Sequence, residues 1–115
     1  MKSSVFVLMK NKEDSSFCFH LAGTDDKILL FGELLSTKSL CIERIAAITI
    51  NVLRDDRFEM LNTGDRYSFL LRSVGGDILA KSENFMSETE RDHILQRVKE
   101  EAVGASIKDM IIAAH

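Results

Sequence analysis

The stretch Phe17-Cys18-Phe19-His20-Leu21 returns in pattern as Tyr67-Ser68-Phe69-Leu70-Leu71, fifty residues further along the chain. Each stretch places large apolar side chains at alternate positions, which is typical of a strand with one buried face. The same offset aligns Ile28-Leu29 with Ile78-Leu79, Glu33 with Glu83, Leu35 with Phe85, and Ile45-x-x-Ile48 with Leu95-x-x-Val98. The sequence therefore predicts two tandem copies of one unit, residues 1–53 and 54–115, within a single domain.

In the first copy, alternation of apolar residues gives way to helical spacing. Three strands are predicted, over Val5–Met9, Phe17–Leu21 and Ile28–Phe31. Apolar residues then recur from Leu40 to Ile48 at the spacing of one helix face, after hydroxyl side chains that can cap a helix start. Alternation returns over Ile48–Val52, and we expect a fourth strand there.

The second copy repeats this order with clearer boundaries. Gly64 and Gly75-Gly76 supply the positive backbone angles that tight hairpins need. Ser87-Glu88-Thr89-Glu90 is a capping box, which fixes the start of the second helix. Ile107–Ala114 predicts the closing strand. Each copy is thus expected to be β-β-β-α-β, and the fold class α+β.

Composition and charge narrow the possible classes of protein. A chain of 115 residues, 45% of them hydrophobic, can bury a core without metal or disulfide. The net charge of -3 and the scattered Lys and Arg residues argue against nucleic-acid binding. The sequence shows no signal peptide and no run long enough to span a membrane, so we expect a cytoplasmic protein with Cys18 and Cys41 as free thiols.

These residues resemble the YegP-like family, small bacterial proteins built from one or two copies of a motif of about fifty residues. The resemblance spans nearly the whole chain and rests on Arg57-Phe58-Glu59, Tyr67-x-Phe69-x-Leu71, Gly76-Asp77-Ile78-Leu79, Ser82-Glu83-x-Phe85 and Leu95-x-x-Val98. It implies a single antiparallel sheet made by both repeats, two helices on one face, and the last strand of each repeat swapped onto the other. It supplies no catalytic residues. The first copy departs from the pattern at Asp25-Asp26, where the second has Gly75-Gly76, and at Gly32, where the second has Ser82.

Two carboxylates, Glu33 and Glu83, recur just after the third strand of each copy. Such a pair is a candidate for ligand binding or acid–base chemistry across a twofold axis. A carboxylate just before a helix more often complements the free amides and the dipole of that helix, and we favour this structural role.

Cys18 and His20 lie two apart on one strand, a spacing that can contribute two ligands to a zinc ion. A closed zinc site needs two further ligands, and Cys41 and His93 lie on predicted helices without any paired motif. We therefore predict no metal and no cofactor.

The first copy carries more apolar surface than its helix can cover. On the strand face away from the helices we expect Cys18 and His20, together with Leu29 and Phe31 or with Ile28 and Leu30, depending on register. Uncovered apolar patches usually mark interfaces. We expect this face to form a twofold dimer, unless the swapped strand or a terminus covers it.

The sequence favours a non-enzymatic interaction or accessory module that uses its sheet face to bind a second copy or another protein. The alternative is a small-ligand-binding protein or enzyme with its site in the groove between the repeats, near Glu33 and Glu83. A polar pocket in that groove would favour the alternative, and a flat apolar sheet face would favour the module.

Overall fold

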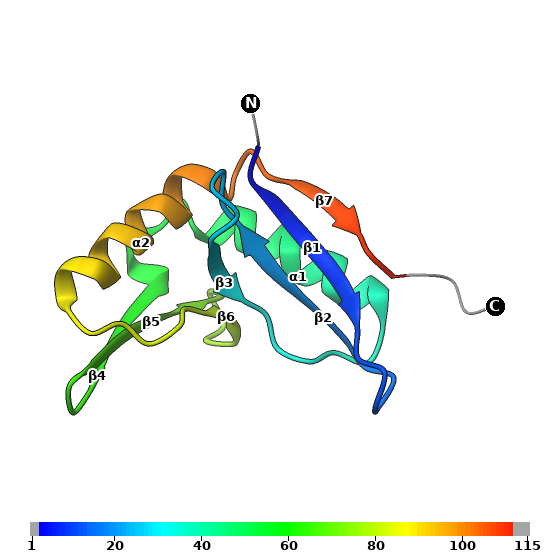
Figure 1. Cartoon of the computed structure of the whole chain (residues 1–115), viewed down its shortest axis with the longest axis horizontal. Coiled ribbons are helices and arrows are strands. Elements are labelled where there is room, and N and C mark those ends of the chain that lie inside the picture. The colour runs from blue at the N-terminus through cyan, green and yellow to red at the C-terminus, as the bar shows by residue number, and fades with distance from the viewer. Residues whose placement is uncertain (1–2, 112–115) are drawn as a thin grey trace.

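The computed structural model describes residues 3–111, which form one seven-stranded sheet and two α-helices (Figure 1). The elements in chain order are β1 (Val5–Lys10), β2 (Phe17–Ala22), β3 (Ile28–Phe31), α1 (Lys38–Asn51), the 3₁₀ turn η1 (Asp55–Arg57), β4 (Phe58–Thr63), β5 (Arg66–Arg72), β6 (Ile78–Lys81), α2 (Glu88–Glu101) and β7 (Ser106–Asp109). The expected α+β class is confirmed.

The strands lie in the order β4-β5-β6-β3-β2-β1-β7. The two halves of the chain meet at the centre, where Phe31 of β3 pairs with Lys81 of β6. Neighbouring strands are antiparallel except β1 and β7, which are parallel, so the prediction of a wholly antiparallel sheet is wrong at this edge. The end of α2 lies beside the start of β1, since the carbonyl of Glu101 accepts a hydrogen bond from the Ser4 hydroxyl at 2.7 Å. The chain therefore enters β7 beside the start of β1 and runs in the same direction.

The predicted fourth strand of the first half is wrong, because Ile48–Asn51 is the last turn of α1 and Val52 is its C-cap. Ile48 and Val52 are buried at helical spacing with Cys41 and Ile45, whereas Ile50 is 66% exposed. The amide of Val52 donates to the carbonyl of Ile48 at 2.9 Å, as a continuing helix requires. The first half therefore offers no strand to exchange, and its order is β-β-β-α.

The closing strand of the second half, β7, is the outermost strand of the sheet beside β1. β7 pairs with β1 from Val5 opposite Ser106 to Leu8 opposite Asp109. Lys38 at the start of α1 donates a hydrogen bond to Asp109, which fixes the far end of β7 and lowers the pKa of that carboxyl. The predicted strand ran from Ile107 to Ala114, and residues 112–114 lie outside the described part of the chain.

Local features of the first half recur in the second half fifty residues later. The two helices are each 14 residues long and begin after hydroxyl caps, Thr37 and Ser87, which accept from the third amide beyond them. Each half has a register shift where its third strand meets its second, at Leu21/Ala22 and Leu71/Arg72. Isolated bridges join Phe17 to Leu35 and Tyr67 to Phe85.

The turns between the second and third strands have the same form in both halves despite their different residues. Asp26 has φ 68° where Gly76 has φ 91°. The amide of Gly23 donates to the carbonyl of Lys27 at 2.8 Å, and the amide of Ser73 donates to that of Asp77 at 2.9 Å. Aspartate is one of the few residues that tolerates the left-handed region, so the first turn keeps its geometry without glycine.

Both helices and both halves of the sheet contribute to one contiguous core. Its largest fully buried side chains are Phe6, Leu8, Phe19, Leu21, Leu29, Leu30, Ile48, Val52, Phe69, Leu71, Ile94 and Val98. Helix α1 packs on β1 and β2 and also on β5 and β6 of the second half, and α2 packs on β5 and on β3 of the first half. Each helix thus covers strands from both halves, and neither of the described helices covers the opposite face of the sheet.

Candidate functional site: the open face of the sheet

The strand pairing sets one row of side chains straight across the sheet. From β7 to β4 the row is Lys108, Val7, His20, Phe31, Lys81, Leu70 and Glu59. Residues next to them along the strands, such as Phe6, Leu21 and Leu71, belong to the core, so alternation places this row on the side away from it. We call this side the open face; in Figure 1 it is the near side of β1 and β2, which lie in front of α1.

The open face is apolar over the first half and charged over the second. Val5, Val7 and Met9 of β1 lie beside Ala22, His20 and Cys18 of β2. Phe31 is 39% exposed at the middle of the sheet. Beyond Phe31 the row passes to Lys81 and ends in Glu59, which accepts from Arg72 at 2.8 Å. The apolar area therefore covers β1, β2 and β3.

The two titratable groups of this apolar area are partly removed from water. Burial lowers the pKa of His20, which lies between Val7 and Phe31, because it disfavours the imidazolium. Burial also raises the pKa of the Cys18 thiol, because it disfavours the thiolate. At neutral pH this part of the open face is consequently uncharged.

The register of β3 decides which pair of its residues lies on the open face. His20 pairs with Phe31 and Leu21 pairs with Leu30, so Phe31 is on the open face and Leu30 is in the core. Leu29 is the extra residue of the register shift and is 1% exposed, within the core cluster. Of the four residues expected on the interface, Cys18, His20 and Phe31 lie on the open face and Leu29 does not.

Glu33 and Glu83 are both exposed, on the loops between the third strands and the helices. The helix caps are Thr37 and Ser87, so neither carboxylate performs the capping role that we favoured. Neither residue lines the pocket between the halves described below. The structure thus brings no polar partners to these two carboxylates among residues 3–111.

Cys18 and Cys41 are free thiols on different elements, and His93 is exposed on α2. Burial raises the pKa of Cys41, an effect that nearby Cys18 strengthens and Arg44 weakens. No group of three or more His, Cys, Asp or Glu side chains in the described part of the chain could hold a metal ion. Nor is any helix there long and apolar enough to cross a membrane.

A cluster of charged side chains, which sequence reasoning missed, joins α2 to the β2–β3 turn. Arg97 donates to both carboxylate oxygens of Asp25, at 2.8 and 3.0 Å, and to Glu101 at 2.7 Å. The hydrogen bonds from Arg97, followed by the amide of Lys27, lower the pKa of Asp25 to about 2. Burial alone would raise the pKa of Glu101, but hydrogen bonds from Arg97 and the amide of Thr24 outweigh it and lower that pKa. The cluster anchors the second helix to the first half.

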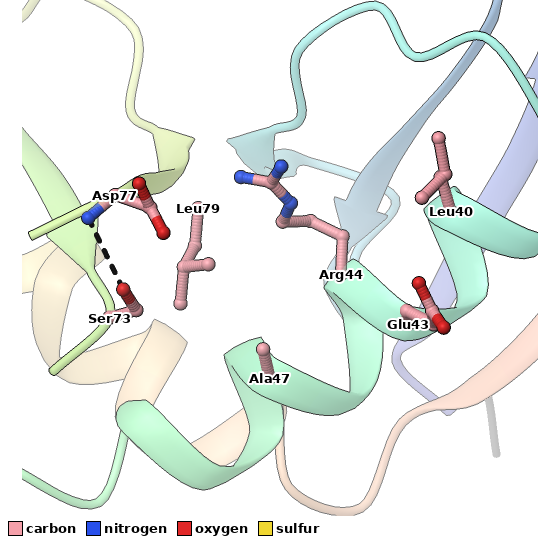
Figure 2. Close-up of a pocket in the computed structure, with 7 residues that line it drawn as sticks. All are labelled: Leu40, Glu43, Arg44, Ala47, Ser73, Asp77 and Leu79. Carbon is pink, nitrogen blue, oxygen red and sulfur yellow. Dashed lines mark hydrogen bonds between the residues drawn. The ribbon is translucent and has the colours of Figure 1, made fainter. Parts of the chain in front are cut away.

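A pocket of about 260 Å³ opens between α1 and the β5–β6 turn (Figure 2). Its lining residues are Leu40, Glu43, Arg44, Ala47, Ser73, Asp77 and Leu79. The guanidinium of Arg44 donates to the carbonyl of Ile78 at 2.6 Å, and the amide of Asp77 donates to the hydroxyl of Ser73 at 3.2 Å. This is a groove between the halves, as the alternative function required, but at residues that the sequence analysis did not select.

Comparison with known proteins gives relatives that match over nearly their whole length. A UPF0339 protein of Pseudomonas aeruginosa is 27% identical over 103 residues, which cover 88% of this chain and 93% of that protein. The solution structure of UPF0339 protein SO3888 from Shewanella oneidensis superposes with a TM-score of 0.90 at 25% identity, over 98% of this chain and 96% of that one. These likenesses support a YegP-like family.

The structure of yegP from E. coli agrees with this assignment at the level of the fold. It also superposes with a TM-score of 0.90, at 22% identity, over 99% of this chain and 98% of that chain. It is described as a protein of unknown function. No family model matches the chain. The YegP-like resemblance inferred from the sequence is thus supported by homologues and by fold.

Proposed function

We propose that this YegP-like protein is a non-enzymatic interaction module that pairs with a second copy of itself through the open face. The observation that carries the proposal is the row Val7, His20 and Phe31, which runs across three neighbouring strands with no described helix over it. An apolar sheet face of this kind can pair with its own copy about a twofold axis, because the same side chains then meet from both copies. Two such faces pack about 10 Å apart, as in a β-sandwich.

The size of the apolar area makes this association weak. Strands β1, β2 and β3 each take up about 4.8 Å of the width of the sheet, and a six-residue strand is about 20 Å long, which gives at most roughly 290 Å² per copy. A standard stable interface buries about 800 Å² on each partner. We therefore expect a reversible dimer that forms at high micromolar concentration, and the module would respond to its local concentration.

Sedimentation equilibrium across a range of concentrations tests the proposal. Phe31→Glu places a charge at the centre of the contact, where pairing with the second copy would bury it, and should leave a folded monomer at every concentration. Ile50→Glu is the matched control, since Ile50 is an exposed apolar residue of α1, away from the open face. It should associate like the wild type. A wild type that stays monomeric at high micromolar concentration would refute the module, and so would Phe31→Glu protein that still dimerises.

We further propose that the chain is a duplicated unit and a UPF0339 family member, with residues 1–115 forming one domain. The equal helices, the paired register shifts and the matching caps at an offset of fifty support duplication. We propose that the two halves exchange elements. Each helix packs partly on strands of the other half, as α2 does on β3, and β7 of the second half pairs with β1 of the first.

The single-domain proposal predicts that neither half folds alone. A polypeptide of residues 54–115 would leave the inner face of α2 without β3, and β7 without β1. Circular dichroism should show it largely unfolded, and mixing it with residues 1–53 should restore the helical signal. A cooperatively folding isolated half would contradict the proposed exchange.

A further inference from the structure

The pocket in Figure 2, between α1 and the β5–β6 turn, corresponds by a shift of fifty residues to the Arg97 cluster, between α2 and the β2–β3 turn. Arg97 and Leu29 both lie beside Gly23, since a Cβ atom there would meet the guanidinium of Arg97 and the Cδ1 atom of Leu29. A shift of fifty residues maps these three onto Ser73, Leu79 and Ala47. All three of the mapped residues line the pocket.

The pocket exists because α1 and the β5–β6 turn lack the side chains that α2 and the β2–β3 turn contribute to the Arg97 cluster. Arg97 is replaced by Ala47, and its two acidic partners, Asp25 and Glu101, are replaced by Gly75 and Asn51. The arginine and both of its carboxylates are therefore absent together. The pocket beside Ala47 therefore lies in the place that corresponds to the side chain of Arg97.

The lining of the pocket has a different set of acids from the Arg97 cluster. Glu43 and Asp77 lie on opposite sides of it, and in Figure 2 the Asp77 carboxylate turns toward its interior. Neither carboxylate forms an ion pair with a described residue. The single cation, Arg44, already donates to the carbonyl of Ile78. Two carboxylates against one engaged guanidinium give the pocket a net negative charge.

The geometry points to a binding site for a guanidinium group on a short apolar stem. In this site the stem packs on Ala47 and Leu79, and the guanidinium donates to Asp77 and to the hydroxyl of Ser73. Carboxylates bind guanidinium strongly because the planar fork of donors matches their two oxygens. The volume of about 260 Å³ is slightly below the roughly 300 Å³ at which drug-sized pockets begin, so a fragment of this size fits. The group would come from a small guanidinium compound or from an arginine side chain of a peptide.

Titration of ¹⁵N-labelled protein with n-propylguanidinium, followed by NMR, tests the site. Saturable shifts should appear at the amides of Ser73, Asp77 and Ala47. The neutral isostere n-propylurea should bind at least about tenfold more weakly, since it lacks the charge that strengthens hydrogen bonds to a carboxylate. Equal binding of the two probes, or shifts produced by propionate instead, would overturn the proposal.

Two pairs of variants check the position of the site. Asp77→Asn should weaken n-propylguanidinium binding about tenfold, whereas Asp65→Asn, in the exposed β4–β5 turn, should not. Ala47→Arg fills the pocket from within and should abolish binding, whereas Ala46→Arg, at an exposed neighbour on α1, should leave it unchanged. Binding that survives in folded Ala47→Arg protein would show that the site lies elsewhere.

A third titration distinguishes the source of the guanidinium. Acetyl-Gly-Arg-Gly-amide carries the same group on a peptide. Tighter binding than n-propylguanidinium indicates a peptide arginine, and weaker binding indicates a small compound. Both results support the site, whereas failure of both probes to bind refutes it without bearing on the open face, because the pocket and that face lie on different sides of the sheet.

Discussion

A Cβ atom at Gly32 would lie 2.5 Å from the Cε1 and Cζ atoms of the Phe19 ring. The ring of Phe19 is buried and meets Phe6 edge to face, with centroids 6.3 Å apart. In the second half the equivalent of Gly32 is Ser82, whose hydroxyl accepts from the amide of Phe69 at 2.9 Å. The two halves thus differ in which atoms fill this space, and the first half has no room for a side chain.

Gly32→Ala is therefore expected to destabilise the protein by about 1–3 kcal/mol, the usual cost of overpacking a core. The measurement is the free energy of unfolding in urea. Phe19→Leu combined with Gly32→Ala should recover part of the loss, because the smaller side chain frees the contested space. A neutral Gly32→Ala substitution would mean that the ring moves aside at no cost.

Phe69→Ala should lose roughly 3–5 kcal/mol of unfolding free energy, since it leaves a cavity at a fully buried position. That loss is a large share of a small domain's stability. Val74→Ala, at a residue 84% exposed, is the control and should change little. A loss below about 1 kcal/mol for Phe69→Ala would be incompatible with its place at the centre of the core.

Gly76→Ala should destabilise by about 1–2 kcal/mol, because an L-residue at φ 91° carries a steric cost that glycine avoids. Gly75→Ala is a close control: its φ is outside the positive region and its Cβ would meet only the Ser73 hydroxyl, at 3.8 Å. The difference between their melting temperatures isolates the backbone effect. Equal melting temperatures would argue against the left-handed turn.

The Arg97 cluster predicts a specific loss of stability in acid. The folded pKa values of Asp25 and Glu101 lie below the usual 3.8 and 4.5, so their contribution is full above pH 4.5 and is lost as the pH falls toward 2. Arg97→Gln should lower the melting temperature at pH 7, and the gap from the wild type should narrow between pH 4.5 and 2. A gap that stays constant over this range would show that the pairs contribute nothing.

His20 predicts that the proposed dimer weakens in mild acid. Burial holds the folded pKa of His20 below 6.5, so the neutral form favours the buried state, and this contribution is lost as the pH falls below 6.5. The other charged residues of the same row are Lys81, Lys108 and Glu59. The dissociation constant should rise between pH 7.5 and 5.5 for the wild type and stay level for His20→Gln. A level wild-type profile would exclude His20 from the contact.

Strands with a single period and helices with a capping motif could be predicted from the sequence. The segment Ile48–Val52 could not, because it satisfies two periods at once. Its alternation predicts a strand, but Ile48 and Val52 also continue the helical spacing of Cys41 and Ile45. The helix buries the residues that follow the helical spacing, and this burial favours the helix over the strand. It leaves the side chain of Ile50 exposed to solvent.

The open face could be predicted only in part, for a reason of the same kind. Alternation along β2 correctly separates Cys18 and His20 from Phe19 and Leu21. In β3 the register shift inserts Leu29, and no local sequence pattern distinguishes the four apolar residues of that strand. The pocket could not be predicted from the sequence, because it arises from a difference between the halves. Ala47 stands where the second half has Arg97, and no local motif marks that difference.

Strand β7 covers β1 on the outer edge of the sheet, through four residues that are themselves exposed. Uncovered, β1 would present free backbone amides and carbonyls beside Val5, Val7 and Met9, which is the kind of edge that recruits other strands. If a protease cut the segment between α2 and β7 and β7 dissociated, the edge of β1 would become a template for aggregation. The buried core residues would all remain in the chain.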